Sequence, residues 1–111
     1  GNMAIMSKDT NMFPATLPDD GLMDVVTIDG TVSRATALTM MNEIPSGRFF
    51  DMPDLNVRKA SAFRLIPHQK EGYISIDGER VPFEAFQAEV HQGLGTILTK
   101  SGRVYEAAGP R

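Results

Sequence analysis

Two turns in this sequence carry carboxylate side chains that could bind a metal-bound nucleotide or a bare cation. The first is Asp77-Gly78-Glu79, in which Asp77-Gly78 lies between the runs 73–76 and 79–82. An Asp-Gly pair between two strand-forming runs is the strongest short-range signal for a β-hairpin with a two-residue turn. Its carboxylates could approach ATP and hold the Mg²⁺ ion through oxygen ligands or waters. Asp-Gly is also favoured in such turns for backbone reasons alone, so a purely structural turn is the alternative.

The second turn is Asp19-Asp20-Gly21, at the end of a loop that begins at residue 13 and contains two prolines. Carboxylates and free carbonyls in such a loop can bind a hard cation, although most loops of this kind only cap or are solvated. His68 and His91 have no metal-ligand spacing around them, and no serine lies in a nucleophile-elbow context. A hydrolase triad and a histidine metal site therefore have no support.

One main helix is predicted, over residues 33–44. Ser33 is the expected N-cap, Pro45 ends the helix, and Gly47 suits the left-handed conformation common just past a helix end. Four apolar residues have the i, i+3, i+4, i+7 spacing of a single helical face: Ala37, Met40, Met41 and Ile44. Such a face is most often core packing. The seven methionines of the chain also fit a pocket that moulds around a flexible alkyl chain.

The rest of the pattern is that of short strands. Residues 22–28 predict a strand that Asp29-Gly30 closes, and residues 55–66 predict a long strand with one bend or an edge stretch. Residues 86–91 alternate apolar and polar side chains, which indicates a strand with one wet face. A last hairpin is expected around the turn at residues 101–102. The predicted fold is mainly β: an antiparallel, β-sandwich-like domain with one helix across it.

Composition limits what this chain could do. Its 111 residues suffice for one domain or one part of a domain, and a formal net charge of -3 argues against nucleic-acid binding. The absence of cysteine excludes disulfides and thiolate metal sites, and fits an intracellular protein. No apolar run is long enough to span a membrane. Because the chain begins at Gly1, we expect a fragment of a longer product.

The order and spacing of several motifs resemble the C-terminal end of sphingoid long-chain-base kinases, above all the fungal branch. These enzymes belong to the sphingosine kinase and diacylglycerol kinase-like lipid kinases. The resemblance covers nearly all of the chain. It is carried by Gly1-Asn2-Met3, Phe13-Pro14-Ala15, Leu17-Pro18-Asp19-Asp20-Gly21-Leu22-Met23-Asp24, Ala62-Phe63-Arg64-Leu65-Ile66-Pro67 and Ile76-Asp77-Gly78-Glu79.

The resemblance implies a two-domain enzyme that uses ATP and Mg²⁺ to phosphorylate the primary hydroxyl of a sphingoid base. Its upstream α/β domain carries a Gly-Gly-Asp-Gly-Thr-like nucleotide loop, and its β-rich domain encloses the lipid. Residues 1–111 would be the C-terminal β-rich, lipid-binding region. The nucleotide loop and the catalytic base aspartate are missing from this sequence. Since phosphoryl transfer depends on positioning ATP, metal and hydroxyl, this chain alone should be inactive.

The resemblance also implies roles for individual residues. Asp77, Gly78 and Glu79 match a turn beside the ATP phosphates and metal. Asp20 matches an aspartate that in related bacterial lipid kinases binds a structural cation, together with carbonyls such as those of Ala15 and Leu22. The side chains matching the acyl-chain tunnel are Ala37, Met40, Met41, Ile44 and Phe49, the last at a position where relatives often carry histidine.

Two alternatives stay open. A diacylglycerol or ceramide kinase would share this β-rich half and differ mainly in the shape of its pocket. A stand-alone β-sandwich that binds a lipid or a protein would have no catalytic half at all. For the kinase, the expected partners are a sphingoid base and the upstream nucleotide-binding domain, with a cytoplasmic location or peripheral membrane association of the parent protein.

Overall fold

The computed structural model describes residues 1–3, 5–8 and 10–98. Its elements form mainly antiparallel β-structure with one α-helix, as the sequence predicts. In chain order they are β1 (Ile5–Ser7), β2 (Thr10–Asn11), β3 (Met23–Ile28), α1 (Arg34–Glu43), the 3₁₀-helix η1 (Arg48–Asp51), β4 (Leu55–Ala60), β5 (Ala62–Leu65), β6 (Ile74–Ile76), β7 (Glu79–Val81) and β8 (Phe86–Glu89).

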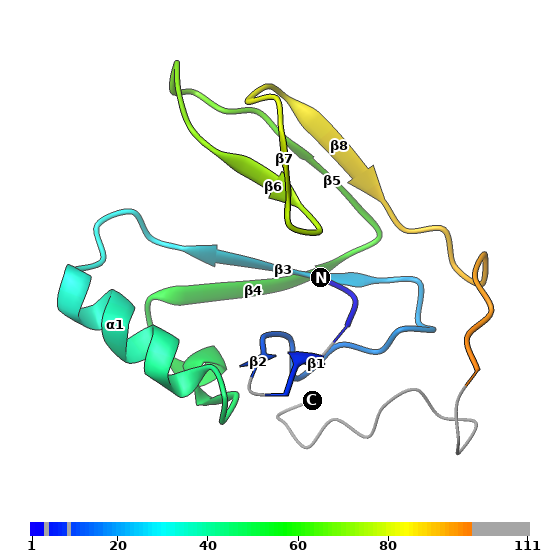
Figure 1. Ribbon diagram of the computed structural model, residues 1–111, viewed down its shortest axis with the longest axis horizontal. Helices are drawn as coiled ribbons and strands as arrows, with labels where there is room; N and C mark the ends of the chain where they lie inside the picture. Colours follow the sequence, from blue (N-terminus) through cyan, green and yellow to red (C-terminus); the bar gives the residue numbers. More distant parts are fainter. Residues whose placement is uncertain (4, 9, 99–111) are drawn as a thin grey trace.

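The pair of strands β3 and β4 forms the centre of the described structure (Figure 1). They run antiparallel in register from Met23↔Ala60 to Ile28↔Leu55. β5 follows β4 after a bend at Ser61 and pairs with β8, and the Val90 N–H donates to the Ser61 carbonyl at 2.8 Å. The long, bent strand predicted over 55–66 is therefore confirmed: its first half pairs with β3 and its second half with β8.

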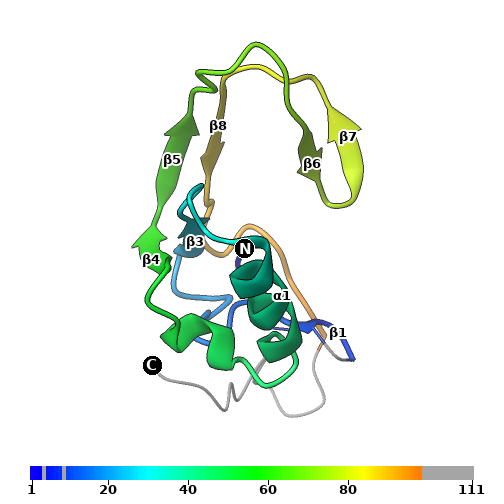
Figure 2. The same cartoon turned by 90° about the vertical axis from the view of Figure 1, so that its left-hand side faces the viewer.

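The hairpin predicted at Asp77-Gly78 is also confirmed. β6 and β7 pair antiparallel, with Ile74 opposite Val81 and Ile76 opposite Glu79. This hairpin and the β5–β8 pair stand beside each other at one end of the described structure (Figure 2). Within the described ranges each sheet has two strands, so every pair has an edge without a strand partner there.

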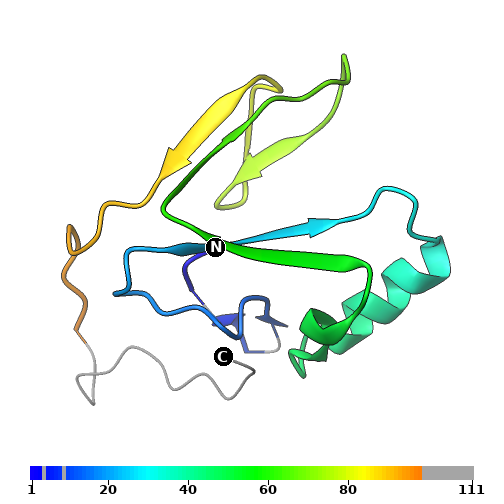
Figure 3. The ribbon, with the colours of Figure 1, turned by 180° about the vertical axis from the view of Figure 1, so that it is seen from behind.

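The helix α1 lies at the end of the β3–β4 ribbon where β3 ends and β4 begins (Figure 3). The Ser33 hydroxyl accepts the Thr36 N–H at 3.1 Å, which confirms the N-cap. Gly47 has φ 71°, so the predicted left-handed residue is confirmed, and it starts η1. α1 packs against η1, and η1 packs against β4. The sequence prediction missed η1, because a single 3₁₀ turn has too little periodicity to detect.

Few apolar side chains are fully enclosed. Among the described residues the buried hydrophobic side chains are Met23, Met40, Phe49 and Ile74, and the most deeply buried residues are Pro14, Thr16 and Asp24. Many large apolar side chains are exposed instead, on α1, at β5 and at the β6–β7 hairpin: examples are Leu38, Met41, Leu65, Ile66, Tyr73 and Ile76. So much open apolar surface is typical of a domain that packs against further polypeptide or ligand.

Residues 96–98, where the last predicted hairpin begins, form no strand, and the remainder of that hairpin lies outside the described residues. The short strands β1 and β2 were not predicted, since their three and two residues carry no alternation long enough to recognise.

Candidate functional site

The Asp77-Gly78 turn has the backbone of a type I′ hairpin. Asp77 has φ 49° and Gly78 has φ 87°, so both central residues are left-handed, as this turn requires. Asp77 and Glu79 are exposed, and neither carboxylate makes a hydrogen bond or ion pair with another described residue. The turn therefore presents two exposed carboxylates that have no partner among the described residues.

A mostly apolar cavity of about 470 Å³ lies between the β6–β7 hairpin and the β5–β8 pair. Its wall includes Ile74, the buried residue of β6, and Phe86 of β8. The Phe86 ring packs edge-on against Phe63 of β5, with ring centroids 5.7 Å apart. His68 lines the same cavity without any second histidine there. The cavity suits an apolar group rather than a metal.

The five side chains expected to line a lipid tunnel fall into two groups. Met40 and Phe49 are buried, each with 4% of its surface exposed. Ala37 and Met41 are exposed, Met41 to 65%, and Ile44 is half-buried. The helical face that the spacing picked out is thus only partly a core face. Its exposed part is free to contact a ligand or more polypeptide.

Of these five residues, Phe49 lines a second apolar cavity, of about 580 Å³. β3 forms one wall through Val26 and Ile28, and β5 and β8 contribute Phe63 and Phe86. The structure therefore places Phe49 in the same cavity as Phe63 and Phe86, which lie 14 and 37 positions further along the sequence. Sequence reasoning missed these partners, because the pairing of β5 with β8 is a long-range contact.

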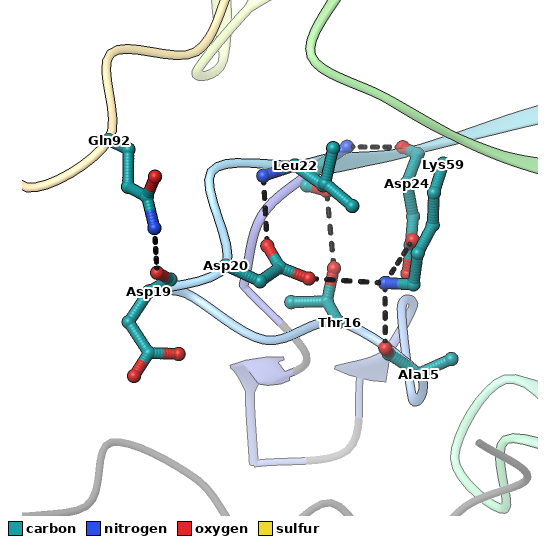
Figure 4. A network of polar contacts seen from close by, with 9 residues as sticks. Ala15, Thr16, Asp19, Asp20, Leu22, Asp24, Lys59 and Gln92 are labelled. Carbon is teal, nitrogen blue, oxygen red and sulfur yellow. Dashed lines mark hydrogen bonds and ion pairs between the residues drawn. The ribbon is translucent and has the colours of Figure 1, made fainter.

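A polar cluster surrounds Asp20 (Figure 4). One oxygen of its carboxylate accepts the Leu22 N–H at 2.9 Å, and the other lies 3.8 Å from Lys59 Nζ. The same ammonium donates to the Ala15 carbonyl at 2.9 Å and lies 2.9 Å from Asp24 Oδ1. We call the carboxylates of Asp20 and Asp24 and the Ala15 carbonyl the oxygen cradle.

Asp24 is the most unusual member of the cradle. Its side chain is 0% exposed, and neither carboxylate oxygen accepts a hydrogen bond from the residues described, so the ion pair between Oδ1 and Lys59 is its polar contact there. Sequence reasoning missed both Asp24 and Lys59. The available signal was an acidic residue inside the apolar run of β3, and a lysine that interrupts the apolar face of the 55–66 strand. Their pairing depends on the β3–β4 register, which sequence spacing does not give.

The described part of the chain contains no group of three or more His, Cys, Asp or Glu side chains placed to hold a metal ion. Within those same ranges no helix has the length and apolar character needed to cross a membrane. These findings leave the Asp77-Gly78-Glu79 turn, the apolar cavities and the oxygen cradle as the candidate sites.

Comparison with known proteins gives the family. The sequence profile described as the YegS C-terminal NAD kinase beta sandwich-like domain matches residues 1–99. The chain belongs to this family. Its antiparallel β-structure with a single helix agrees with a β-sandwich-like domain, and the fold predicted from sequence is confirmed.

Several relatives of this YegS C-terminal domain are kinases of sphingoid bases. Sphingoid long chain base kinase 4 of Schizosaccharomyces pombe is 37% identical over 101 residues, which is 89% of this chain and 22% of that protein. Sphingoid long chain base kinase 5 of Saccharomyces cerevisiae is 34% identical over 93% of this chain and 15% of its own length. Human sphingosine kinase 2 is 37% identical over 73% of this chain. The chain thus spans less than a quarter of the first two relatives.

Proposed function

We propose that this domain is the C-terminal, lipid-binding region of an ATP-dependent kinase that phosphorylates the primary hydroxyl of sphingoid long-chain bases. The observation that carries the proposal is the 34–37% identity to sphingoid base kinases over most of the chain. Sphingosine, sphinganine and phytosphingosine are the proposed substrates. ATP with Mg²⁺ is the proposed phosphoryl donor.

The turn Asp77-Gly78-Glu79 is the proposed contact of this domain with the metal-bound nucleotide. Its support is the type I′ backbone and the two exposed carboxylates, which are free of partners in the described structure. Carboxylates are the protein ligands that Mg²⁺ prefers, often through its bound waters. Gly78 has nothing within 4 Å of the position of an added Cβ, so a phosphate group has room to approach the backbone there.

The apolar face of α1, together with η1, is the proposed wall of the lipid tunnel. Met40 and Phe49 would form its fixed base, and the exposed Met41 would contact the alkyl chain directly. Ala37 and Ile44 would complete the same face. Methionine suits this role because its unbranched side chain adapts to a flexible alkyl chain.

The proposed partner of the domain is an upstream nucleotide-binding region of the same protein. Its support is the small share of each relative that this chain covers and the large apolar side chains left open on β5 and β6. Without that region the chain should bind lipid weakly and transfer no phosphate. The parent protein would be cytoplasmic or associate peripherally with membranes to reach its lipid.

The test is phosphate transfer from labelled ATP to sphinganine and to diacylglycerol. The gene product extended upstream of Gly1 is assayed beside the present chain. We expect labelled sphinganine phosphate from the longer product only. Transfer to diacylglycerol instead would replace the sphingoid substrate by a glycerolipid, and no transfer to either lipid would leave a non-catalytic binding domain.

The role of the turn is tested in the longer product by Asp77→Asn and Glu79→Gln. Asparagine tolerates the left-handed conformation, so the first change removes charge and keeps the turn. We expect each variant to raise the Mg²⁺-ATP requirement or to lower turnover by roughly 10-fold or more. The matched control is Glu89→Gln on the exposed face of β8, which should change neither. Unchanged kinetics in both turn variants would reduce the turn to a hairpin connection.

A further inference from the structure

The oxygen cradle has the composition of a cation site. Its three oxygen groups come from separate places: the Ala15 carbonyl from the proline-containing loop, the Asp20 carboxylate from the following turn, and the Asp24 carboxylate from β3. All three converge on Lys59 Nζ, which reaches them from β4 (Figure 4). Two carboxylates and a backbone carbonyl are also the groups that hard divalent ions bind.

The carboxylate of Asp24 requires a positive charge at this point. Its side chain is fully buried, and an uncompensated buried carboxylate is strongly unfavourable. Among the described residues, Lys59 is the cation within ion-pair distance of it. The neighbouring Asp20 carboxylate is fixed by the Leu22 N–H, so it adds negative charge at a set position.

The distances fit an ammonium and not a metal. Lys59 Nζ lies 2.9 Å from the Ala15 carbonyl and 2.9 Å from Asp24 Oδ1, which are hydrogen-bond and ion-pair distances. Oxygen ligands of Ca²⁺ lie at about 2.3–2.6 Å and those of Mg²⁺ at about 2.0–2.1 Å. A divalent ion that shared the cradle with the ammonium would also suffer like-charge repulsion.

We propose that the Lys59 ammonium is the resident cation of the oxygen cradle and takes the place of a divalent metal ion there. The ammonium joins the β3–β4 ribbon to the loop that carries Ala15 and Asp20. Asp20 therefore acts through Lys59 and binds no metal itself. This inference does not depend on the proposed kinase function.

The test compares thermal unfolding and Ca²⁺ binding in the longer gene product without nucleotide. For the unchanged protein we expect the same Tm in EDTA and in about 1 mM Ca²⁺. Lys59→Ala should lower the Tm by roughly 5 °C or more, because it leaves buried Asp24 uncompensated. Ca²⁺ should then bind the vacated cradle and recover at least about half of that loss. The double variant Lys59→Ala/Asp20→Asn should lose the Ca²⁺ response.

Two results would overturn the proposal. The first is a Tm of the unchanged protein that falls in EDTA or rises with Ca²⁺, in a way that Asp20→Asn abolishes, since the cradle would then hold a metal beside Lys59. The second is a destabilised Lys59→Ala variant that does not respond to Ca²⁺, which would reduce Lys59 to a cross-strand ion pair. If Lys59→Ala does not fold, the EDTA and Ca²⁺ comparison on the unchanged protein decides by itself.

Discussion

Asp24 and Lys59 face each other as direct partners in the β3–β4 register, and Lys59 Nζ lies 2.9 Å from Asp24 Oδ1. Opposite charges directly across an antiparallel pair stabilise the chosen register. Here one of the two charges is fully buried, so the pair matters more than an exposed ion pair on a strand surface. The ion pair therefore helps to fix β3 against β4 and, through Ala15, against the preceding loop.

This ion pair predicts that removing one of the two charges destabilises the protein more than removing both. Lys59→Met leaves the Asp24 charge buried alone and should cost about 3 kcal/mol of stability, the lower end of the usual range because Lys59 is 39% exposed. Asp24→Leu combined with Lys59→Met removes both charges and should cost clearly less than the single change. Denaturant unfolding of the longer gene product measures both. The control is Arg58→Met, an exposed neighbour in β4 that should change little. A double variant less stable than Lys59→Met would contradict the argument.

The local features of this fold could be predicted from sequence because each has a short-range physical cause. The Asp77-Gly78 hairpin follows from turn chemistry, α1 follows from the Ser33 cap and the stop at Pro45, and the bend at Ser61 follows from interrupted alternation. Which strands pair could not be predicted in the same way. β3 pairs with β4 and β5 pairs with β8 across intervening elements, so no local signal specifies them.

The residues of the candidate sites show the same difference between short-range features and long-range pairing. The turn carboxylates could be proposed as a site because their spacing is local, whereas the Asp24–Lys59 pair depends on a cross-strand register and was missed. The spacing of Ala37, Met40, Met41 and Ile44 places these residues along one side of α1, but spacing does not say how much of that side is covered. In the structure Met40 is covered and Met41 is not.

Gly47 should not tolerate a side chain. Its φ of 71° is left-handed, and an added Cβ would lie 3.0 Å from Asn11 Nδ2 and 3.6 Å from the Pro14 ring. Backbone strain and the tight contact together predict a loss of about 1–3 kcal/mol for Gly47→Ala. The matched control is Gly30→Ala, where nothing lies within 4 Å, and its effect should stay within about 0.5 kcal/mol. Equal denaturation midpoints for the two variants would show that the Gly47 conformation adapts freely.

Asp29 should titrate below its ordinary range. The Thr31 N–H and the Thr31 hydroxyl donate to Asp29 Oδ1 at 2.9 and 2.8 Å, and these bonds lower the pKa of the carboxyl from its usual 3.8. A depressed folded-state pKa means that the Asp29 contribution to stability is fully present above pH 3.8 and is lost as pH falls through the lower folded value. NMR titration of the Asp29 carboxyl carbon gives the pKa directly. In Asp29→Asn, the acid-side slope of stability against pH should be shallower than in the parent. A midpoint at or above 3.8 would contradict the prediction.

Met40 and Met41 are adjacent in sequence but should have separable roles, because one is 4% exposed and the other 65%. Met40→Ala removes buried volume beneath α1 and should cost about 2–5 kcal/mol of stability. Met41→Ala should leave stability within about 0.5 kcal/mol. If Met41 contacts the alkyl chain as proposed, the same change removes apolar contact worth about 1–2 kcal/mol and raises KM for sphinganine roughly 5- to 30-fold. Denaturant unfolding and lipid kinase kinetics of the longer gene product measure the two effects separately.

Leu38→Ala, which changes another exposed apolar residue of α1, is the control and should alter neither stability nor KM. An unchanged KM in Met41→Ala would remove Met41 from the lipid tunnel, while an equal change in Leu38→Ala would show a general effect of α1 hydrophobicity rather than a specific contact.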